Sequence, residues 1–247
     1  MPETAFIKQV NQIKENLQGI EVRIRRAAES TGRDPSEIKI IAVTKLMPLE
    51  TIKAGIEAGL RDFGENYPEQ AVEKINALTK DVEITWHMIG HIQSRKTSTV
   101  CSYFAWVHSV DRMKIARYLD RYSREEDQVM PVLIEVNLSG EESKYGWKAW
   151  DEDTWSELVP QFGKISEMAN IEIHGLMTMP PFFDDPELTR PYYRRLRRLQ
   201  GFLKNKLPDV CWESLSIGTS FDYEVAIEEG ATMVRLGTSI FGPRPSR

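Results

Sequence analysis

The amino-acid sequence predicts an α/β fold, a TIM (β/α)8 barrel, and three observations support it. Eight short apolar runs alternate with longer amphipathic segments, which indicates βαβ crossovers and a parallel sheet. The chain of 247 residues is close to the roughly 250 residues typical of such barrels. A doubly wound open sheet is the alternative, but the first run ends in Thr44-Lys45-Leu46-Met47-Pro48, without the glycine-rich phosphate loop usual there. We therefore expect one barrel domain over residues 1–247.

The elements follow from hydrophobic spacing. Apolar residues recur at helical intervals over residues 4–30, so a helix is expected before the first strand. The expected strands are 38–44, 60–64, 84–90, 104–110, 131–138, 171–177, 214–217 and 232–236. The expected helices between them are 49–58, 68–78, 94–101, 113–123, 151–168, 186–203 and 222–229.

Composition narrows the functional classes. Lys and Arg number 32 and Asp and Glu 37, for a net charge of −5, so a general nucleic-acid or anionic-membrane binder is not expected. Two distant cysteines, Cys101 and Cys211, predict reduced thiols without a metal site. The N-terminal residues show no leader pattern, and no apolar run approaches the ~18 residues of a membrane span. We expect a cytoplasmic protein.

Lys45 lies at the end of the first expected strand, where barrels build their sites from the loops that follow the strands. A lysine there loses its proton more readily when it is partly desolvated, and the neutral amine condenses with an aldehyde. An ordinary surface lysine or an ion-pair partner is the alternative.

The loops after the last two strands predict a phosphate site. Ser216-Ile217-Gly218-Thr219-Ser220 and Arg235-Leu236-Gly237-Thr238-Ser239 occupy the positions where barrels often hold phosphate. Gly218 and Gly237 let backbone N–H groups approach the oxygens, and the hydroxyls of Ser216 and Thr238 are potential donors. Ser220 is expected only to cap the following helix.

Other polar residues carry weaker expectations. Arg235 is expected to be buried in its strand and to reach across the mouth; the alternative role, a salt bridge with Glu65 or Glu135, is compatible with the first. Asn66 follows the second strand and is expected to contact a ligand edge. His87 is expected to be a satisfied core residue, and the basic run 194–198 a solvated helix face.

Several motifs together resemble the pyridoxal phosphate homeostasis protein family, whose fold is similar to the N-terminal barrel of alanine racemase, a fold-type III pyridoxal phosphate (PLP) fold. They extend in order from the first strand to the C-terminus. They are Ala42-Val43-Thr44-Lys45, Gly64-Glu65-Asn66-Tyr67, Trp86-His87-Met88-Ile89-Gly90, Glu142-Ser143-Lys144-Tyr145-Gly146, His174-Gly175-Leu176-Met177-Thr178-Met179, Leu215-Ser216-Ile217-Gly218-Thr219-Ser220 and Val234-Arg235-Leu236-Gly237-Thr238-Ser239.

The resemblance implies a role for each site residue. Lys45 would hold PLP as a Schiff base, Arg235 would face the pyridine nitrogen, and Asn66 and Met177 would lie beside the ring. The residues implied for the phosphate cradle are Ser216, Gly218, Gly237 and Thr238.

The sequence departs from the family pattern at three positions. Met47 replaces a second lysine, His91 follows Gly90 where proline is usual, and Arg95 replaces an asparagine. If the second lysine helps to pass the cofactor on, another group is needed here, and Lys144 is our hypothesis.

The resemblance implies a carrier that manages PLP and amino-acid balance without established turnover. Arginine cannot protonate the pyridine nitrogen, and no length remains after the eighth strand for the extra domain that racemases use. The expected partners are PLP and apo forms of PLP enzymes, and a monomer is expected, with a dimer as the alternative. An amino-acid racemase, or an aldolase-like barrel using a bare Lys45, are the rival classes.

Overall fold

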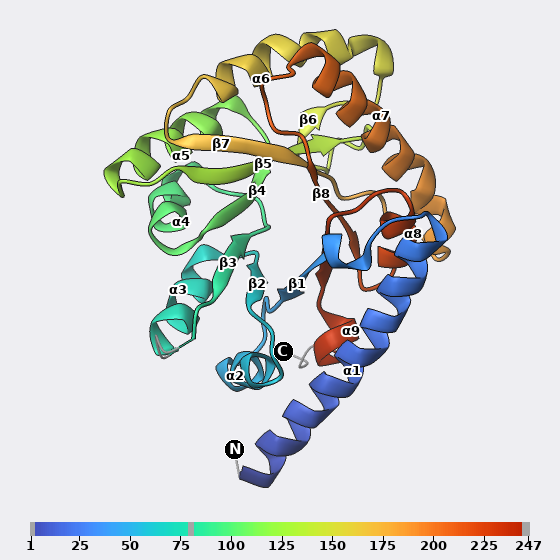
Figure 1. Cartoon of the computed structure of the whole chain (residues 1–247). Coiled ribbons are helices and arrows are strands. Elements are labelled where there is room, and N and C mark those ends of the chain that lie inside the picture. Colours follow the sequence, from blue (N-terminus) through green and yellow to red (C-terminus); the bar gives the residue numbers. More distant parts are fainter. Residues whose placement is uncertain (1–2, 79–81, 244–247) are drawn as a thin grey trace.

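Eight parallel strands form a closed ring in the computed structural model, which describes residues 3–78 and 82–243 (Figure 1). Around the ring the order is β4-β3-β2-β1-β9-β8-β7-β5, and pairing of β4 with β5 closes it. The strands are β1 (Lys39–Val43), β2 (Asp62–Glu65), β3 (Thr85–Met88), β4 (Trp106–Val110), β5 (Met130–Asn137), β7 (Ile171–Met177), β8 (Ser214–Thr219) and β9 (Met233–Leu236). The predicted barrel is confirmed and the open sheet is excluded. The predicted domain limits at residues 1 and 247 lie outside the described residues.

Helices cover the outside of the ring in the expected order. Each of the first eight α-helices begins and ends within a few residues of its prediction or fills the C-terminal part of it, whereas the last, short α-helix has no counterpart among the predicted helices. The helices are α1 (Glu3–Ser30), α2 (Leu49–Glu57), α3 (Pro68–Ala77), α4 (Thr97–Tyr103), α5 (Met113–Glu125), α6 (Val159–Ser166), α7 (Arg190–Lys206), α8 (Tyr223–Glu228) and α9 (Thr238–Phe241).

Three predicted helices are divided. The segments over 94–101, 151–168 and 186–203 each begin with a 3-10 turn, namely η2 (Ser94–Lys96), η3 (Glu152–Glu157) and η4 (Pro186–Thr189). In both α6 and α7 the second residue is a proline. Proline lacks the N–H that would continue the preceding turn, so the α-helix begins there.

One short strand was not predicted. β6 (Trp147–Lys148) pairs in parallel with the end of β5, through Val136 and Asn137. Two residues are too few to produce a periodic hydrophobic signal. This extra strand extends the sheet at the mouth without entering the ring.

Two hydrophobic clusters separate the inside of the barrel from its outside. A small inner cluster contains Ile41, Leu133, Met177 and Met233. The large cluster packs the outer strand faces against the helices, including the buried stripe of α1 and the stripe Tyr193, Leu196, Leu199 and Leu203 of α7. The arginines of the run 194–198 lie on the outer face of α7, as predicted.

Two further expectations concern single residue types. Both Cys101 and Cys211 are free thiols. Across residues 3–78 and 82–243, no group of three or more potential ligands is arranged to hold a metal ion. No helix in the same ranges is long and apolar enough to cross a membrane.

Candidate functional site

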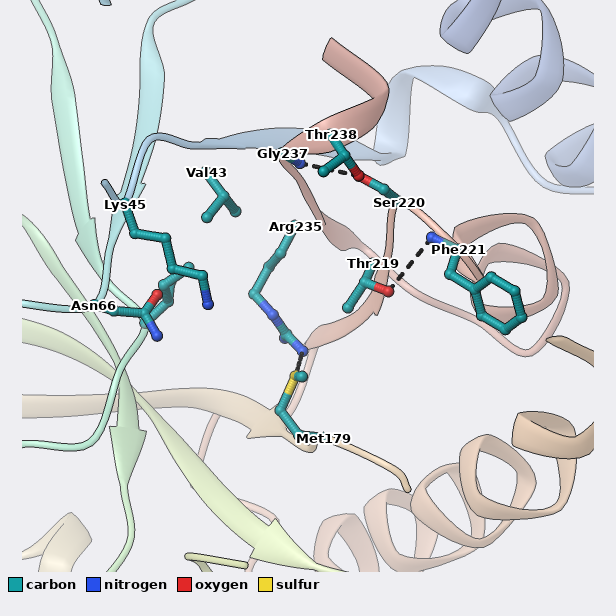
Figure 2. A pocket seen from close by; sticks show the side chains of 11 residues that line it. Val43, Lys45, Asn66, Met179, Thr219, Ser220, Phe221, Arg235, Gly237 and Thr238 are labelled. Carbon is teal, nitrogen blue, oxygen red and sulfur yellow. Dashed lines mark hydrogen bonds between the residues drawn. The ribbon is translucent and has the colours of Figure 1, made fainter. Parts of the chain in front are cut away.

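A cavity opens at the carboxyl ends of the strands, with a volume of about 450 Å³ (Figure 2). It falls in the range of roughly 300–1,000 Å³ usual for small-molecule sites. Its wall combines the last residues of β1, β8 and β9 with residues that follow β1, β2, β3, β7, β8 and β9. The lining residues are Val43, Lys45, Asn66, Ile89, Met179, Thr219, Ser220, Phe221, Arg235, Gly237 and Thr238.

Lys45 follows β1 by two residues, and its side chain extends into the cavity beside Asn66 (Figure 2). The preceding residue, Thr44, is fixed from two sides. Its hydroxyl donates to Glu65 Oε1 at 2.8 Å, and its carbonyl accepts from Lys74 Nζ at 2.9 Å. Lys74 also donates to Glu65 at 2.6 Å, forming a buried ion pair. Leu46, at φ 63°, then turns the chain away from the strand direction. The backbone on both sides of Lys45 is therefore well defined.

Arg235 lies across the cavity from Lys45 (Figure 2) and is only 5% exposed. Its Nη1 donates to the carbonyl and hydroxyl oxygens of Ser216, the latter at 2.7 Å. Its Nη2 donates to Thr178 O at 3.0 Å and contacts Met179 Sδ at 2.8 Å. Burial lowers the pKa of this guanidinium, although arginine still keeps its charge near neutral pH.

The alternative role of Arg235, a salt bridge with Glu65 or Glu135, is not found. Glu65 pairs with Lys74 instead, and no carboxylate in the described ranges lies within ion-pair distance of Arg235. The physical reason is that uncharged acceptors, mainly backbone carbonyls, already surround both terminal nitrogens. These contacts use the four N–H groups of the two terminal nitrogens, so an acceptor in the cavity would bind to the remaining Nε N–H or replace the contact with Met179 Sδ.

The loops after β8 and β9 converge on one point. Ser220 Oγ accepts hydrogen bonds from the backbone N–H groups of Gly237 (3.0 Å) and Ser239 (3.2 Å), and lies 3.0 Å from Ser239 Oγ. Two neighbouring N–H groups that point at one oxygen form the kind of nest that binds phosphate.

The expectation that Ser220 caps the following helix is wrong. Asp222 precedes α8 in the capping position, and its Oδ1 accepts from Thr219 instead. Because β8 extends to Thr219, two residues beyond its predicted end, the loop that faces the cavity begins later than expected.

Three other predicted site residues do not line this cavity. Met177 is buried in the inner cluster, and Met179, two residues beyond the end of β7, lines the cavity instead. Ser216 is fully buried beneath Arg235. Gly218 shapes the loop, because its φ is 87° and a Cβ atom there would lie 2.7 Å from Ala226 Cβ.

Asn66 supplies an acceptor that faces the cavity. Within the described residues its Oδ1 is buried and has no hydrogen-bond partner. Such an oxygen costs free energy unless a donor or water reaches it. A ligand that carries a hydroxyl or N–H group would satisfy it.

A second cavity adjoins the first and shares Asn66, Ile89 and Met179 with it. Glu135 and Lys144 lie in its wall. Lys144 Nζ donates to Pro180 O at 2.7 Å and Met179 O at 3.3 Å. Burial and the nearby Asp111 raise the pKa of Glu135 to about 7.

The fold and the site together define a class: a (β/α)8 barrel in which one cavity has a lysine on one wall and a nest of backbone N–H groups on the other. The family model for the alanine racemase N-terminal domain matches residues 11–245. The pyridoxal phosphate homeostasis protein of Aquifex aeolicus is 39% identical over 93% of this chain and 97% of that protein. The chain belongs to this family of pyridoxal phosphate homeostasis proteins.

Solved structures agree with this assignment. PipY of Synechococcus elongatus, determined with PLP bound, is 30% identical, with a TM-score of 0.82 over 93% of this chain and all of PipY. Alanine racemase of Clostridium difficile shares the fold at 16% identity and a TM-score of 0.68, over 96% of this chain and 57% of the racemase.

Proposed function

We propose that this chain binds pyridoxal 5′-phosphate, held as a Schiff base on Lys45. The observation that carries the proposal is one cavity lined by Lys45, Arg235 and Ser220, whose Oγ accepts from the N–H groups of Gly237 and Ser239. An aldehyde, a pyridine nitrogen and a phosphate on one small molecule match these three groups. The relatives' name and the ligand of PipY support the same molecule.

The residues present fit that molecule at both ends. Lys45 would hold the aldehyde carbon, while Gly237, Ser239, Thr238 and Ser220 would bind the phosphate. Arg235 would donate to the ring nitrogen, and the unsatisfied Asn66 Oδ1 would accept from a ring substituent or water. Two residues would act without contacting the ligand. Gly218 would shape the backbone that leads into the loop after β8, and Ser216 would hold Arg235.

We further propose a carrier function without catalytic turnover. Bound PLP supplies electron withdrawal, which is strongest when its ring nitrogen is protonated. Arg235 cannot supply that proton, because a guanidinium keeps its own. The fold shared with alanine racemase favours a racemase as the second candidate. A carrier would buffer PLP in the cytoplasm and would pass it to apo-enzymes. Free thiols such as Cys101 are consistent with that compartment, where thiols stay reduced.

The discriminating experiment combines binding with turnover. The protein, stripped of ligand, is titrated with PLP while the visible absorption is recorded, and then incubated with single L- and D-amino acids. The proposal expects saturable binding at one site per chain, lost in Lys45→Ala, and no change in amino-acid chirality. Chirality exchange that requires Lys45 would establish the racemase instead. Failure to bind PLP would refute both.

A further inference from the structure

A continuous chain of hydrogen bonds crosses the interior of the barrel. Asp62 Oδ1 lies 3.0 Å from His87 Nε2, and His87 Nδ1 lies 3.0 Å from His108 Nε2. His108 Nδ1 lies 2.9 Å from Ser216 Oγ, which in turn accepts from Arg235 Nη1 at 2.7 Å. This series of hydrogen bonds therefore connects Arg235 in the cavity to the Asp62 carboxylate at the start of β2.

The two ends of this chain face different surroundings. Asp62 is the first residue of β2, whereas the cavity lies beyond the last residues of the strands. The Asp62 side chain is 21% exposed and pairs with Lys39 at 3.1 Å. His87, His108 and Ser216 are fully buried, and none of them lines the cavity.

When Asp62 is ionised and both imidazoles are neutral, only one arrangement of protons uses every hydrogen bond of this network. A carboxylate can only accept, so His87 donates through Nε2–H and accepts at Nδ1. His108 then donates through its own Nε2–H and accepts at Nδ1 from the Ser216 hydroxyl. The Ser216 oxygen keeps its lone pairs for Arg235. Burial lowers the pKa of both imidazoles, which keeps each neutral, as this arrangement requires.

A buried polar network of this kind is costly unless every member is satisfied. Here the last member is a buried guanidinium with no carboxylate within ion-pair distance in the described residues. The direction of the Ser216 hydroxyl decides whether its oxygen offers a lone pair to Arg235 in the observed place. That direction is set by His108, and through His87 by Asp62.

We propose that Asp62, His87, His108 and Ser216 are positioning residues for Arg235, so that ligand affinity at the mouth depends on a carboxylate at the opposite end of the barrel. The affinity readout rests on the proposed PLP function. The proton arrangement is a property of the ligand-free chain and can be tested alone.

The first test determines the histidine tautomers by long-range ¹H–¹⁵N NMR of the ligand-free protein. Replacing the partly exposed pair, His91→Gln and His174→Gln, leaves only the two buried imidazoles in the spectrum. We expect both to be neutral Nε2–H tautomers at pH 7. In Asp62→Leu the acceptor is lost, and we expect both tautomers to reverse together. A protonated imidazole, an Nδ1–H tautomer in the parent protein, or an unchanged His108 in Asp62→Leu would overturn the proposal.

The second test measures PLP affinity. We expect Asp62→Leu to weaken binding about tenfold, and Asp62→Asn, which keeps an acceptor oxygen, to restore most of it. Glu213→Leu is the matched control, because Glu213 also pairs with a lysine (Lys204, 2.7 Å) directly before a strand. We expect no change there. Equal affinity in Asp62→Leu and the parent protein would contradict the coupling.

If Asp62→Leu does not fold, a second variant, Ser216→Ala, tests the same network. Ser216→Ala removes the hydroxyl at the opposite end of the hydrogen-bond network, which is the donor to His108 Nδ1. The ¹⁵N shift of His108 Nδ1 must therefore change, while His87 still donates to Asp62. An unchanged His108 signal would again overturn the proposal. If the parent chain binds no PLP, the proposed function fails, yet the tautomers still decide whether the network exists.

Discussion

Ser220 and Gly237 lie on neighbouring loops and are joined by a hydrogen bond of 3.0 Å from the Gly237 N–H to the Ser220 hydroxyl oxygen. The same oxygen accepts from the N–H of Ser239. It therefore occupies a position that suits a phosphate oxygen. When phosphate binds, the Ser220 side chain would turn from acceptor to donor.

Ser220→Ala should weaken PLP binding about tenfold, because one hydrogen bond to a charged group contributes roughly 1.5–3 kcal/mol. Equilibrium dialysis with PLP measures the effect. Ser166→Ala is the control, since Ser166 bonds only its own helix at Gly163 O. Unchanged or tighter binding in Ser220→Ala would show that the serine merely competes for the nest.

Gly218→Ala should destabilise the fold by about 3 kcal/mol, from left-handed strain together with steric overlap. The new Cβ would lie 2.7 Å from Ala226 Cβ and 2.9 Å from Tyr223 Cα. Gly32→Ala is the matched control, because Gly32 has φ 71° with nothing within 4 Å, and it should cost only about 1 kcal/mol. Urea unfolding gives both values. Equal losses would mean that α8 moves freely to accommodate the methyl group.

Glu135→Gln should change stability in a pH-dependent way. The pKa of Glu135 is raised from 4.5 to about 7 in the folded chain, so the folded state binds this proton more tightly than the unfolded state. The resulting contribution to the free energy of unfolding is fully present below pH 4.5 and is lost as the pH rises through 7. Relative to the parent protein, the variant should gain about 2 kcal/mol of unfolding free energy between pH 5 and pH 8. The exposed Glu142→Gln serves as control. A pH-independent difference would contradict the burial argument.

Lys144→Ala should slow transfer of PLP to an apo-enzyme severalfold while leaving PLP affinity nearly unchanged. Lys144 lies in the wall of the adjoining cavity, not of the first one, and its amine is held by the carbonyls of Met179 and Pro180. Stopped-flow reactivation of an apo-enzyme measures the rate. Lys148→Ala, an exposed lysine over Trp150, is the control. Transfer at the parental rate would remove Lys144 from this step.

The ring of strands could be predicted from the sequence, because each buried parallel strand appears as a short apolar run between amphipathic helices. It also brought Lys45, Asn66, Arg235, Gly237 and Thr238 to one end of the barrel, since loops that follow parallel strands share that end. All five residues line the cavity.

What the sequence could not supply depends on where each strand ends and which side chains meet inside. Met179, Thr219 and Phe221 line the cavity because β7 and β8 end where tertiary packing sets them. His87 was correctly predicted to be a satisfied core residue. Its partner His108 lies 21 residues away, and no pattern in the sequence links the two.

The most direct measurement is reduction of the PLP-loaded protein with borohydride, followed by peptide mapping. Reduction fixes the cofactor on whichever amine holds it. The expected result is a single labelled peptide with the label on Lys45, absent from Lys45→Arg and retained in Lys144→Arg. A label on Lys144, Lys74 or several surface lysines, with Lys45 unmodified, would contradict the assignment.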